Sequence, residues 1–210
     1  MKIVTLVVGD MYQTNCYIVY DEQKRAAVID PGDEADRILS VIRDHGLSVE
    51  AVLLTHHHFD HIMAADAVLK ATGAKLYAFG SDAALLQDPN HILLYMSPYD
   101  SCAPLTADRA LADGDTVSVG AMTFRALHTP GHTAGSCCYI ADDVMFSGDT
   151  LFENSIGRMD FVGGSPRDML QSMQKLYRLT ADYTVYPGHG PATTLAREKV
   201  NNPYMRRHGR

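Results

Sequence analysis

Seven consecutive residues, Thr55–His61, carry the densest group of potential metal ligands in this 210-residue chain. Five of them carry an imidazole or a carboxylate, groups that zinc and other divalent first-row metals accept as ligands, and four are the candidate ligands: His56, His58, Asp60 and His61. Burying these groups together would be costly unless a cation neutralised them. In an extended segment His56 and His58 point to the same side, whereas the two ligands that follow are adjacent and must diverge. We therefore interpret the segment as half of a binuclear metal site.

Three further candidate ligands follow, each at the end of an expected strand and beside a glycine. They are His132 in Thr129–Ser136, Asp149 in Ser147–Thr150 and His189 in Tyr186–Pro191. Glycine allows the backbone to turn sharply and to approach a ligand closely, and loops at strand ends commonly carry function. Each residue alone is explained more simply as part of a Gly/Pro turn. Together with the first segment, the three favour a metal centre.

The hydrophobic pattern predicts strands and helices intermixed along the chain. The expected strands are Ile3–Val8, Asn15–Tyr20, Ala26–Asp30, Ala51–Thr55, Lys75–Phe79, Thr116–Val119, Met122–Leu127, Ser136–Ile140, Val144–Ser147 and Thr184–Tyr186. The expected helices are Glu34–His45, Asp60–Thr72, Ser81–Gln87, Met169–Leu179 and Thr193–Val200. We expect residues 88–108 to form an irregular loop or a helical insert that flanks a site. This order predicts an α+β fold of four layers, with helices on the outer faces of two packed sheets.

Composition narrows the class of protein. We expect residues 1–210 to form one domain with a substantial core, because 46% of them are hydrophobic. The net charge of −7 gives no general attraction to nucleic acid or to an anionic membrane. The N-terminus lacks the pattern of a signal peptide, so we expect a cytoplasmic protein. The four cysteines form no Cys-x-x-Cys pair, and we interpret them as buried small hydrophobic residues.

The ordered set His56-x-His58-x-Asp60-His61, His132, Asp149 and His189 resembles the metallo-β-lactamase superfamily, and Asp30 in Ile29–Gly32 resembles its first motif. The resemblance covers nearly the whole chain and implies an αβ/βα sandwich with the metals at one edge. It implies that His56, His58 and His132 hold the first metal. Asp60, His61 and His189 would hold the second, and Asp149 would bridge the two ions. Asp30 would be a supporting residue rather than a ligand.

The chemistry implied by this ligand set is hydrolysis by metal-activated water. Two cations about 3.5–4 Å apart can share one water and lower its pKa toward roughly 7, which gives a bridging hydroxide at neutral pH. The same pair polarises a carbonyl oxygen and stabilises the anion formed on attack. Zinc is the first expectation, and iron or manganese also fits the ligands. We expect Asp60 to orient the hydroxide as well as to bind metal.

The segment Gly148–Phe161, with Pro187–Pro191, is similar to the glyoxalase II group and most similar to its short bacterial members. This similarity implies hydrolysis of a small thioester such as S-lactoylglutathione. Full-length glyoxalase II enzymes carry a C-terminal helical domain that binds glutathione, whereas this chain ends at Arg210, too soon after His189 for such a domain. Recognition of glutathione therefore stays open. No oligomeric state is indicated.

Arg158 is the candidate for binding a substrate carboxylate, because a guanidinium matches that group in shape and charge. The equally simple alternative is that it fixes its own loop by pairing with Asp160. Tyr95 and Tyr99 in the insert are candidates for the pocket wall, although simple packing explains them better. His128 is interpreted as a packing residue at a strand end. The remaining histidines match no motif and are interpreted as supporting or surface residues: His45, His57, His91 and His208.

Other functions stay open at this point, because a fold does not determine a reaction. The element Gly157–Phe161 also resembles that of persulfide dioxygenases, in which one iron would be held by His56, His132 and Asp149. The Pro-Gly-His-Gly form around His189 favours the glyoxalase-like alternative. A lactonase or β-lactamase is compatible with the motifs but not favoured by them. A non-catalytic binding protein on this fold would have lost ligands, and none is lost here.

Overall fold

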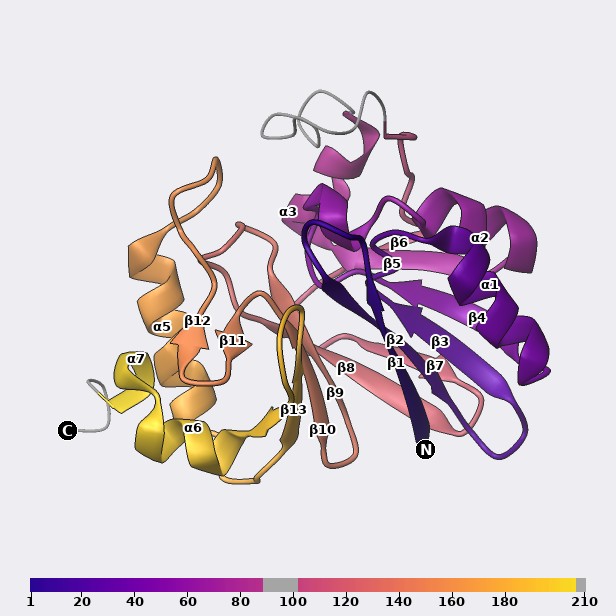
Figure 1. Ribbon diagram of the computed structural model, residues 1–210. Helices are drawn as coiled ribbons and strands as arrows, with labels where there is room; N and C mark the ends of the chain where they lie inside the picture. Colours follow the sequence, from indigo (N-terminus) through magenta and orange to yellow (C-terminus); the bar gives the residue numbers. More distant parts are fainter. Residues whose placement is uncertain (89–101, 207–210) are drawn as a thin grey trace.

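Two six-stranded β-sheets pack face to face in the computed structural model, which describes residues 1–88 and 102–206 (Figure 1). The strand order of the first sheet is β1 (Lys2–Val8), β2 (Thr14–Tyr20), β3 (Arg25–Ile29), β4 (Ser48–Leu53), β5 (Lys75–Phe79) and β6 (Arg109–Leu111). The order of the second sheet is β14 (Thr193–Thr194), β13 (Thr184–Pro187), β10 (Val144–Gly148), β9 (Cys137–Ala141), β8 (Met122–His128) and β7 (Thr116–Val119). A separate hairpin pairs β11 (Leu151–Phe152) with β12 (Ser155–Ile156).

Helices cover the outer face of each sheet (Figure 1). The first sheet carries α1 (Ala35–Asp44), α2 (Ala65–Thr72) and α3 (Gly80–Ala83), with 3-10 turns at η1 (Phe59–His61) and η2 (Leu85–Gln87). The second sheet carries α5 (Pro166–Tyr177), α6 (Leu195–Asn201) and α7 (Pro203–Arg206). This arrangement confirms the expected four-layer α+β sandwich. None of the helices in the described ranges has the length and apolar character needed to cross a membrane.

Alternation of side chains along the strands separates three apolar cores. In β2, Ile18 packs under the helices of the first sheet, whereas Tyr17 and Val19 pack between the two sheets. In β9, Cys137 faces the core between the sheets and Cys138 faces the core under α5. The period of two residues in a strand produces this division. The cysteines are all buried and free of disulfides, as expected.

Three expected helices differ in the structure. The short helix expected over Ser81–Gln87 is divided into the helical turn α3 and the 3-10 turn η2. The helix expected over Asp60–Thr72 is interrupted, because η1 ends at His61 and α2 begins only at Ala65, after Ala64 N–H has bonded to Pro31 O at 3.0 Å. The helix expected over Thr193–Val200 begins as β14, which pairs with β13, and the helical turns start at Leu195. The elements that the pattern did not predict have only two to four residues each: β6, β11, β12 and α7. Such short elements are below the length at which periodicity can be recognised.

Strands of both sheets end at one edge of the sandwich. β3 and β4 run parallel in the first sheet. β10 and β13 run parallel in the second sheet, and β8 has the same direction because both β8 and β10 are antiparallel to β9. At this edge the sheets are joined by Asn15 N–H, which donates to Gly188 O at 2.7 Å. The loops that follow these strands are therefore gathered in one place.

The core between the sheets should dominate the stability of the fold. Phe124 is fully buried there, and we expect Phe124→Ala to lower the free energy of unfolding by about 3–5 kcal/mol. Its neighbour Thr123 is exposed, so Thr123→Ala serves as the matched control and should change the free energy by less than about 1 kcal/mol. Urea unfolding followed by circular dichroism measures both. Equal effects of the two substitutions would contradict the placement of this core.

Candidate metal centre

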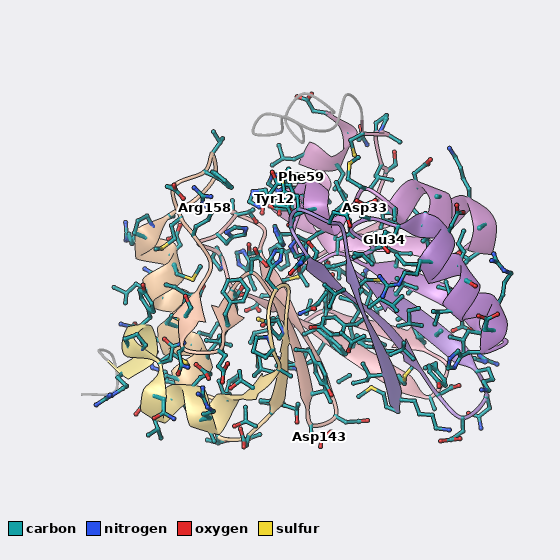
Figure 2. The ribbon with its side chains drawn as sticks, viewed as in Figure 1. Tyr12, Asp33, Glu34, Phe59, Asp143 and Arg158 are labelled. Atoms are coloured by element: carbon teal, nitrogen blue, oxygen red, sulfur yellow. The ribbon has the colours of Figure 1, made fainter. Side chains whose placement is uncertain are left out.

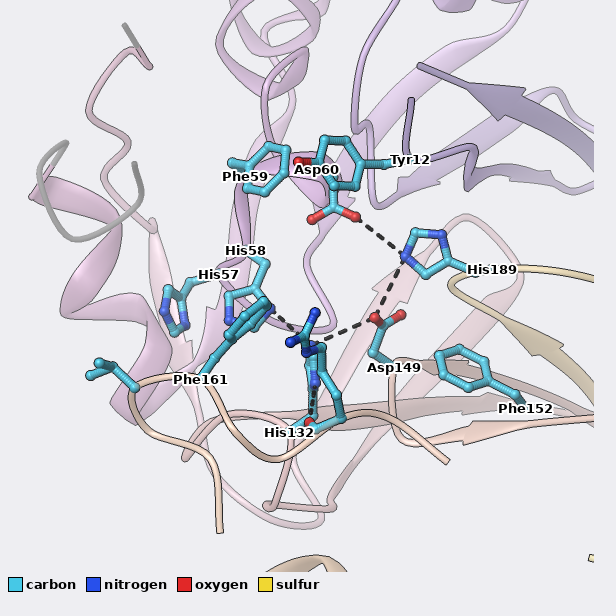
Figure 3. Close-up of a pocket in the computed structure, with 12 residues that line it drawn as sticks. Tyr12, His57, His58, Phe59, Asp60, His132, Asp149, Phe152, Phe161 and His189 are labelled. Atoms are coloured by element: carbon cyan, nitrogen blue, oxygen red, sulfur yellow. Dashed lines mark hydrogen bonds and ion pairs between the residues drawn. The ribbon is translucent and has the colours of Figure 1, made fainter. Parts of the chain in front are cut away.

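The structure brings all seven predicted ligand residues together at this edge of the sandwich. Ligand-capable atoms lie within 4.8 Å of one another in two separate groups: His56, His58 and His132, and Asp60, His61 and His189. Asp149 lies between the groups, with Oδ2 3.5 Å from Nε2 of both His132 and His189. Figure 3 shows this central position of Asp149. The geometry thus contains two adjacent sites that share one carboxylate.

Each ligand residue is delivered by the end of an element. The loop after β4 carries His56 and His58, and η1 carries Asp60 and His61. Loops directly after β8, β10 and β13 carry the other three, His132, Asp149 and His189. At Gly188 there is no room for a larger residue, because a Cβ would overlap the Asp149 carboxylate and the His61 ring. The glycine beside this histidine therefore has a steric role in the site.

In two histidines of the first group, Nδ1 is hydrogen-bonded to an outer partner, which leaves Nε2 as the nitrogen available to a metal ion. His132 Nδ1 donates to Arg158 O at 2.7 Å, so its Nε2 carries the lone pair and lies 2.8 Å from His58 Nδ1. Thr55 Oγ1 donates to Asp30 and can therefore accept from His56 Nδ1, which lies 3.0 Å away. His56 Nε2 is then the nitrogen with the lone pair. Such outer partners are what orient metal-binding histidines in proteins.

Burial keeps two histidines of the first group, His56 and His58, uncharged. Desolvation, with the neighbouring imidazole of His132, lowers the pKa of His58 to about 3, and desolvation lowers that of His56 well below its usual range. Both rings are therefore neutral near pH 7. The neutral imidazole is the form that binds a metal ion.

Two buried polar atoms test whether this arrangement fits metal ions. Among the described residues, His56 Nε2 and Asp149 Oδ1 have no hydrogen-bond partner, although both are shielded from water. The nearest candidate for Asp149 Oδ1 is His61 Nε2, at 3.4 Å and without hydrogen-bond geometry. Buried polar groups are rarely left unsatisfied. A cation in each group would satisfy both atoms, so the residues fit a pair of divalent ions.

Asp30 supports the second group rather than joining it. Its Oδ1 accepts the Thr55 N–H at 2.8 Å, and its Oδ2 accepts Thr55 Oγ1–H at 2.7 Å and His61 Nδ1–H at 2.9 Å. Asp30, His56 and His61 also satisfy the distance criterion for a metal group. Both Asp30 oxygens are already engaged, however, and the His61 nitrogen that remains is Nε2. This nitrogen faces Asp60 and Asp149.

Carboxylates set the charge of the second group. Burial alone would lower the pKa of His61, but Asp60, Asp149 and Asp30 outweigh burial and raise that pKa well above its usual value. Asp60 Oδ2 in turn accepts Thr14 Oγ1–H at 3.2 Å and lies 3.2 Å from His189 Nε2. A metal ligand must give up its proton. Metal binding to this group would therefore release protons from its histidines.

Asp82 is a site residue that the sequence reasoning missed. Its buried carboxylate accepts the His57 N–H at 3.0 Å, the Thr133 hydroxyl at 2.8 Å and the Gly135 N–H at 2.7 Å, and it lies 2.8 Å from His57 Nδ1. Burial alone would raise its pKa, but the bonds from His57, Thr133 and Gly135 keep the pKa below its usual value. Asp82 thus ties the loop of His56 and His58 to the loop of His132. Its position just after β5, at the same edge, is the signal that could have revealed it.

A cavity of about 340 Å³ opens onto both groups. Besides the ligands, its lining includes His57, Arg158 and apolar side chains for which the sequence predicted no role: Tyr12, Phe59, Phe152, Phe161 and Val162. Arg158 is paired with Asp160 through Nε and one terminal nitrogen, at 2.8 Å each. The ion pair lowers the pKa of Asp160 to about 2. The structure therefore shows the alternative in which Arg158 fixes its own loop.

The other histidines lie as follows. His57 is buried against Asp82 and borders the cavity, and His45 is exposed on the surface beside Tyr20. His128 stacks on Phe79 at 4.0 Å between ring centres and donates from Nε2 to Ala134 O, which confirms it as a packing residue. Four residues interpreted from the sequence lie outside the described ranges: His91, Tyr95, Tyr99 and His208.

Known proteins with similar sequences include hydrolases. Hydroxyacylglutathione hydrolase GloC of Haemophilus influenzae is 34% identical to this chain, over 92% of the chain and 93% of that protein. The probable polyketide biosynthesis zinc-dependent hydrolase BaeB of Bacillus velezensis is 32% identical, over 93% of the chain and 83% of that protein. In both cases the similarity extends along nearly the whole chain.

Solved structures agree with the fold. BLEG-1 B3 metallo-beta-lactamase superposes with a TM-score of 0.91 at 35% identity, covering 97% of this chain and 99% of that one. TTHA1623 in a di-iron-bound form gives a TM-score of 0.84 at 33% identity, covering 96% and 99%. The family model of the metallo-beta-lactamase superfamily matches residues 9–189, a range that spans all seven candidate ligands. This chain therefore belongs to the metallo-beta-lactamase superfamily and is a metallohydrolase of that family.

Proposed function

We propose that this chain hydrolyses thioesters with two divalent metal ions, zinc first among them. The observation that carries the proposal is the pair of ligand groups that share Asp149, with two buried atoms left unpaired among the described residues. The thioester assignment is supported by the similarity to the hydrolase GloC. Zinc is supported by the histidine and carboxylate ligands and by the zinc-dependent hydrolase BaeB, whereas the di-iron form of TTHA1623 makes iron the alternative.

The residues of the chain have distinct tasks in this proposal. His56, His58 and His132 would hold one ion, Asp60, His61 and His189 would hold the other, and Asp149 would contact both. The bound ions would supply an activated water and an electrophile for the scissile carbonyl. Asp60 is held by Thr14 at Oδ2, and its carboxylate borders the cavity, where it can orient that water by accepting a hydrogen bond from it. Overall, water adds to the carbonyl carbon and the C–S bond breaks, which releases a carboxylic acid and a thiol.

A second candidate function is β-lactam hydrolysis. It is favoured by one observation, the TM-score of 0.91 and 35% identity with BLEG-1 B3 metallo-beta-lactamase. The two reactions use the same attack on a carbonyl carbon but differ in the bond that breaks, C–S in one and C–N in the other. The site geometry alone is compatible with both.

Metal binding gives the first test of the two-ion site. Protein stripped by a chelator and reloaded with excess zinc should hold two equivalents of zinc per chain by mass spectrometry of the metal content. Asp149→Ala should hold one equivalent or fewer and lose at least ~100-fold in turnover, because changes to mere outer partners already cost 10–100-fold. The matched control is Asp143→Ala, an exposed aspartate at the opposite edge of the molecule (Figure 2), which should keep both ions. A wild-type protein that never exceeds one equivalent would show the two-ion proposal to be wrong.

The reaction itself is tested by comparing bond types in the zinc-loaded protein. Thiol release from S-lactoylglutathione and from simple acyl thioesters should be readily measured and should disappear when the metal is removed. Ring opening of a chromogenic β-lactam should be slower by at least ~100-fold in kcat/KM. The iron-loaded protein should consume no oxygen with glutathione persulfide. If no thiol is released, thioester hydrolysis is wrong. Ring opening of the lactam would then support β-lactam hydrolysis, and oxygen consumption would support persulfide oxidation.

A further inference from the structure

Aromatic and aliphatic side chains surround the opening of the cavity beside the two ligand groups. They are Tyr12, Phe59, Phe152, Phe161 and Val162. They come from different parts of the chain: the turn between β1 and β2, η1, β11 and the loop after β12. Tyr12 and Val162 are exposed over 36% and 50% of their surface. Exposed apolar side chains around a concave site commonly mark a surface that contacts a ligand.

These side chains border both ligand groups. Tyr12 packs edge-on against Phe59, with 4.8 Å between ring centres, next to Asp60 (Figure 3). The Phe161 ring centre lies 5.7 Å from that of His58 in the first group, and the Phe152 ring centre lies 6.2 Å from that of His189 in the second. A substituent next to the reacting carbonyl would therefore lie against these rings.

The charged residue at the opening does not offer a free cation. Within the described lining, Arg158 is the one lysine or arginine, and both its Nε and a terminal nitrogen bond to Asp160. The guanidinium carbon lies over the Phe161 ring, 3.8 Å from the ring centre. A thiol carrier with several carboxylates would have to displace Asp160 from this pair. Recognition of such a carrier has no ready partner in the described lining.

The cavity is also small. Its volume of about 340 Å³ is near the lower end of the ~300–1,000 Å³ that ligand pockets occupy. A compact acyl group next to the scissile bond fits this volume, whereas a tripeptide carrier would extend beyond it.

We propose that the acyl group of the substrate is uncharged and apolar, with the bulk of a phenylacetyl group or a short branched chain. The rings of Tyr12 and Phe161, on separate sides of the opening, select this group by burying its surface. The thiol carrier contributes little to recognition. This inference rests on the proposed thioester hydrolysis and names the substrate class of that same site.

The test uses zinc-loaded full-length protein and thioesters of one uncharged thiol, N-acetylcysteamine. We expect kcat/KM for the phenylacetyl thioester to exceed that for the lactoyl thioester by roughly tenfold or more, since differences of this size follow from filling an apolar pocket. S-lactoylglutathione should be hydrolysed within about threefold of lactoyl-N-acetylcysteamine, because the carrier is not recognised. An equal or reversed acyl preference, or a tenfold gain from the glutathione carrier, would overturn the inference.

Variants of the aromatic residues locate the selectivity. Tyr12→Ala and Phe161→Ala should each reduce the ratio of phenylacetyl to lactoyl kcat/KM by roughly three- to tenfold, because each removes part of the apolar contact surface. Tyr12→Phe should retain the ratio, since the ring rather than the hydroxyl makes the contact. The matched control is Met11→Ala, an exposed apolar neighbour that does not line the cavity, and it should behave as wild type. An unchanged ratio in both alanine variants would show that these rings do not contact the acyl group.

The two proposals fail in different ways. If no thioester releases its thiol, thioester hydrolysis is wrong and the substrate class is lost with it. If both N-acetylcysteamine thioesters are hydrolysed at the same rate, the proposed function stands and the inference about the acyl group alone is wrong.

Discussion

The buried carboxylate of Asp30 is the constraint on which the rest of the site depends. It follows β3 directly in a left-handed backbone conformation, with φ of 49°, and bonds to the backbone and hydroxyl of Thr55 after β4. The same carboxylate accepts a hydrogen bond from His61, and the Thr55 hydroxyl that it holds accepts one from His56. One side chain therefore sets the ring orientation of a histidine in each ligand group. A carboxylate this deeply buried is retained only when such bonds repay its desolvation.

The two sheets need a further connection before their loops can share a site. Asn15 in β2 provides it: its side chain donates to Pro187 O at 3.0 Å and to Gly190 O at 2.9 Å, and its backbone N–H donates to Gly188 O. The loop of His189 is thereby held by the first sheet, although it belongs to the second. Asp82 makes the corresponding link between the loops of His57 and Thr133. These bonds use backbone groups that the loops would otherwise leave unpaired.

The four layers and the common position of the seven candidate ligands could be predicted from the sequence, because both follow from local patterns. Alternating strands separate the cores, and histidine or aspartate beside glycine marks the strand ends. The sequence was not sufficient where a tertiary contact decides the structure. The bond from Ala64 to Pro31 interrupts a helix that periodicity predicted to start at Asp60. The pairing of β14 with β13 likewise overrides the helical pattern at Thr193. In the sequence, Asp82 cannot be distinguished from other aspartates at helix starts. Its contact with the loop after β4 becomes apparent only when the structure places β5 beside β4.

The apolar residues that line the cavity are less constrained by the fold than the candidate ligands are. His132 and His61 are fixed by bonds to a backbone carbonyl and to the buried Asp30 carboxylate, so replacing either of them disturbs the network around it. Tyr12 and Val162, in contrast, lie in turns and keep much of their surface exposed, so other side chains can replace them at small cost to the fold. Arg158 combines both kinds of role, since its carbonyl orients His132 while its side chain pairs with Asp160 at the opening. The backbone at this position is thus tied to the chemistry of the site, whereas the side chain fixes the loop at the opening. The candidate ligands and most of the apolar cavity wall are thus different residues, which is why motifs that identify the ligands do not determine the substrate.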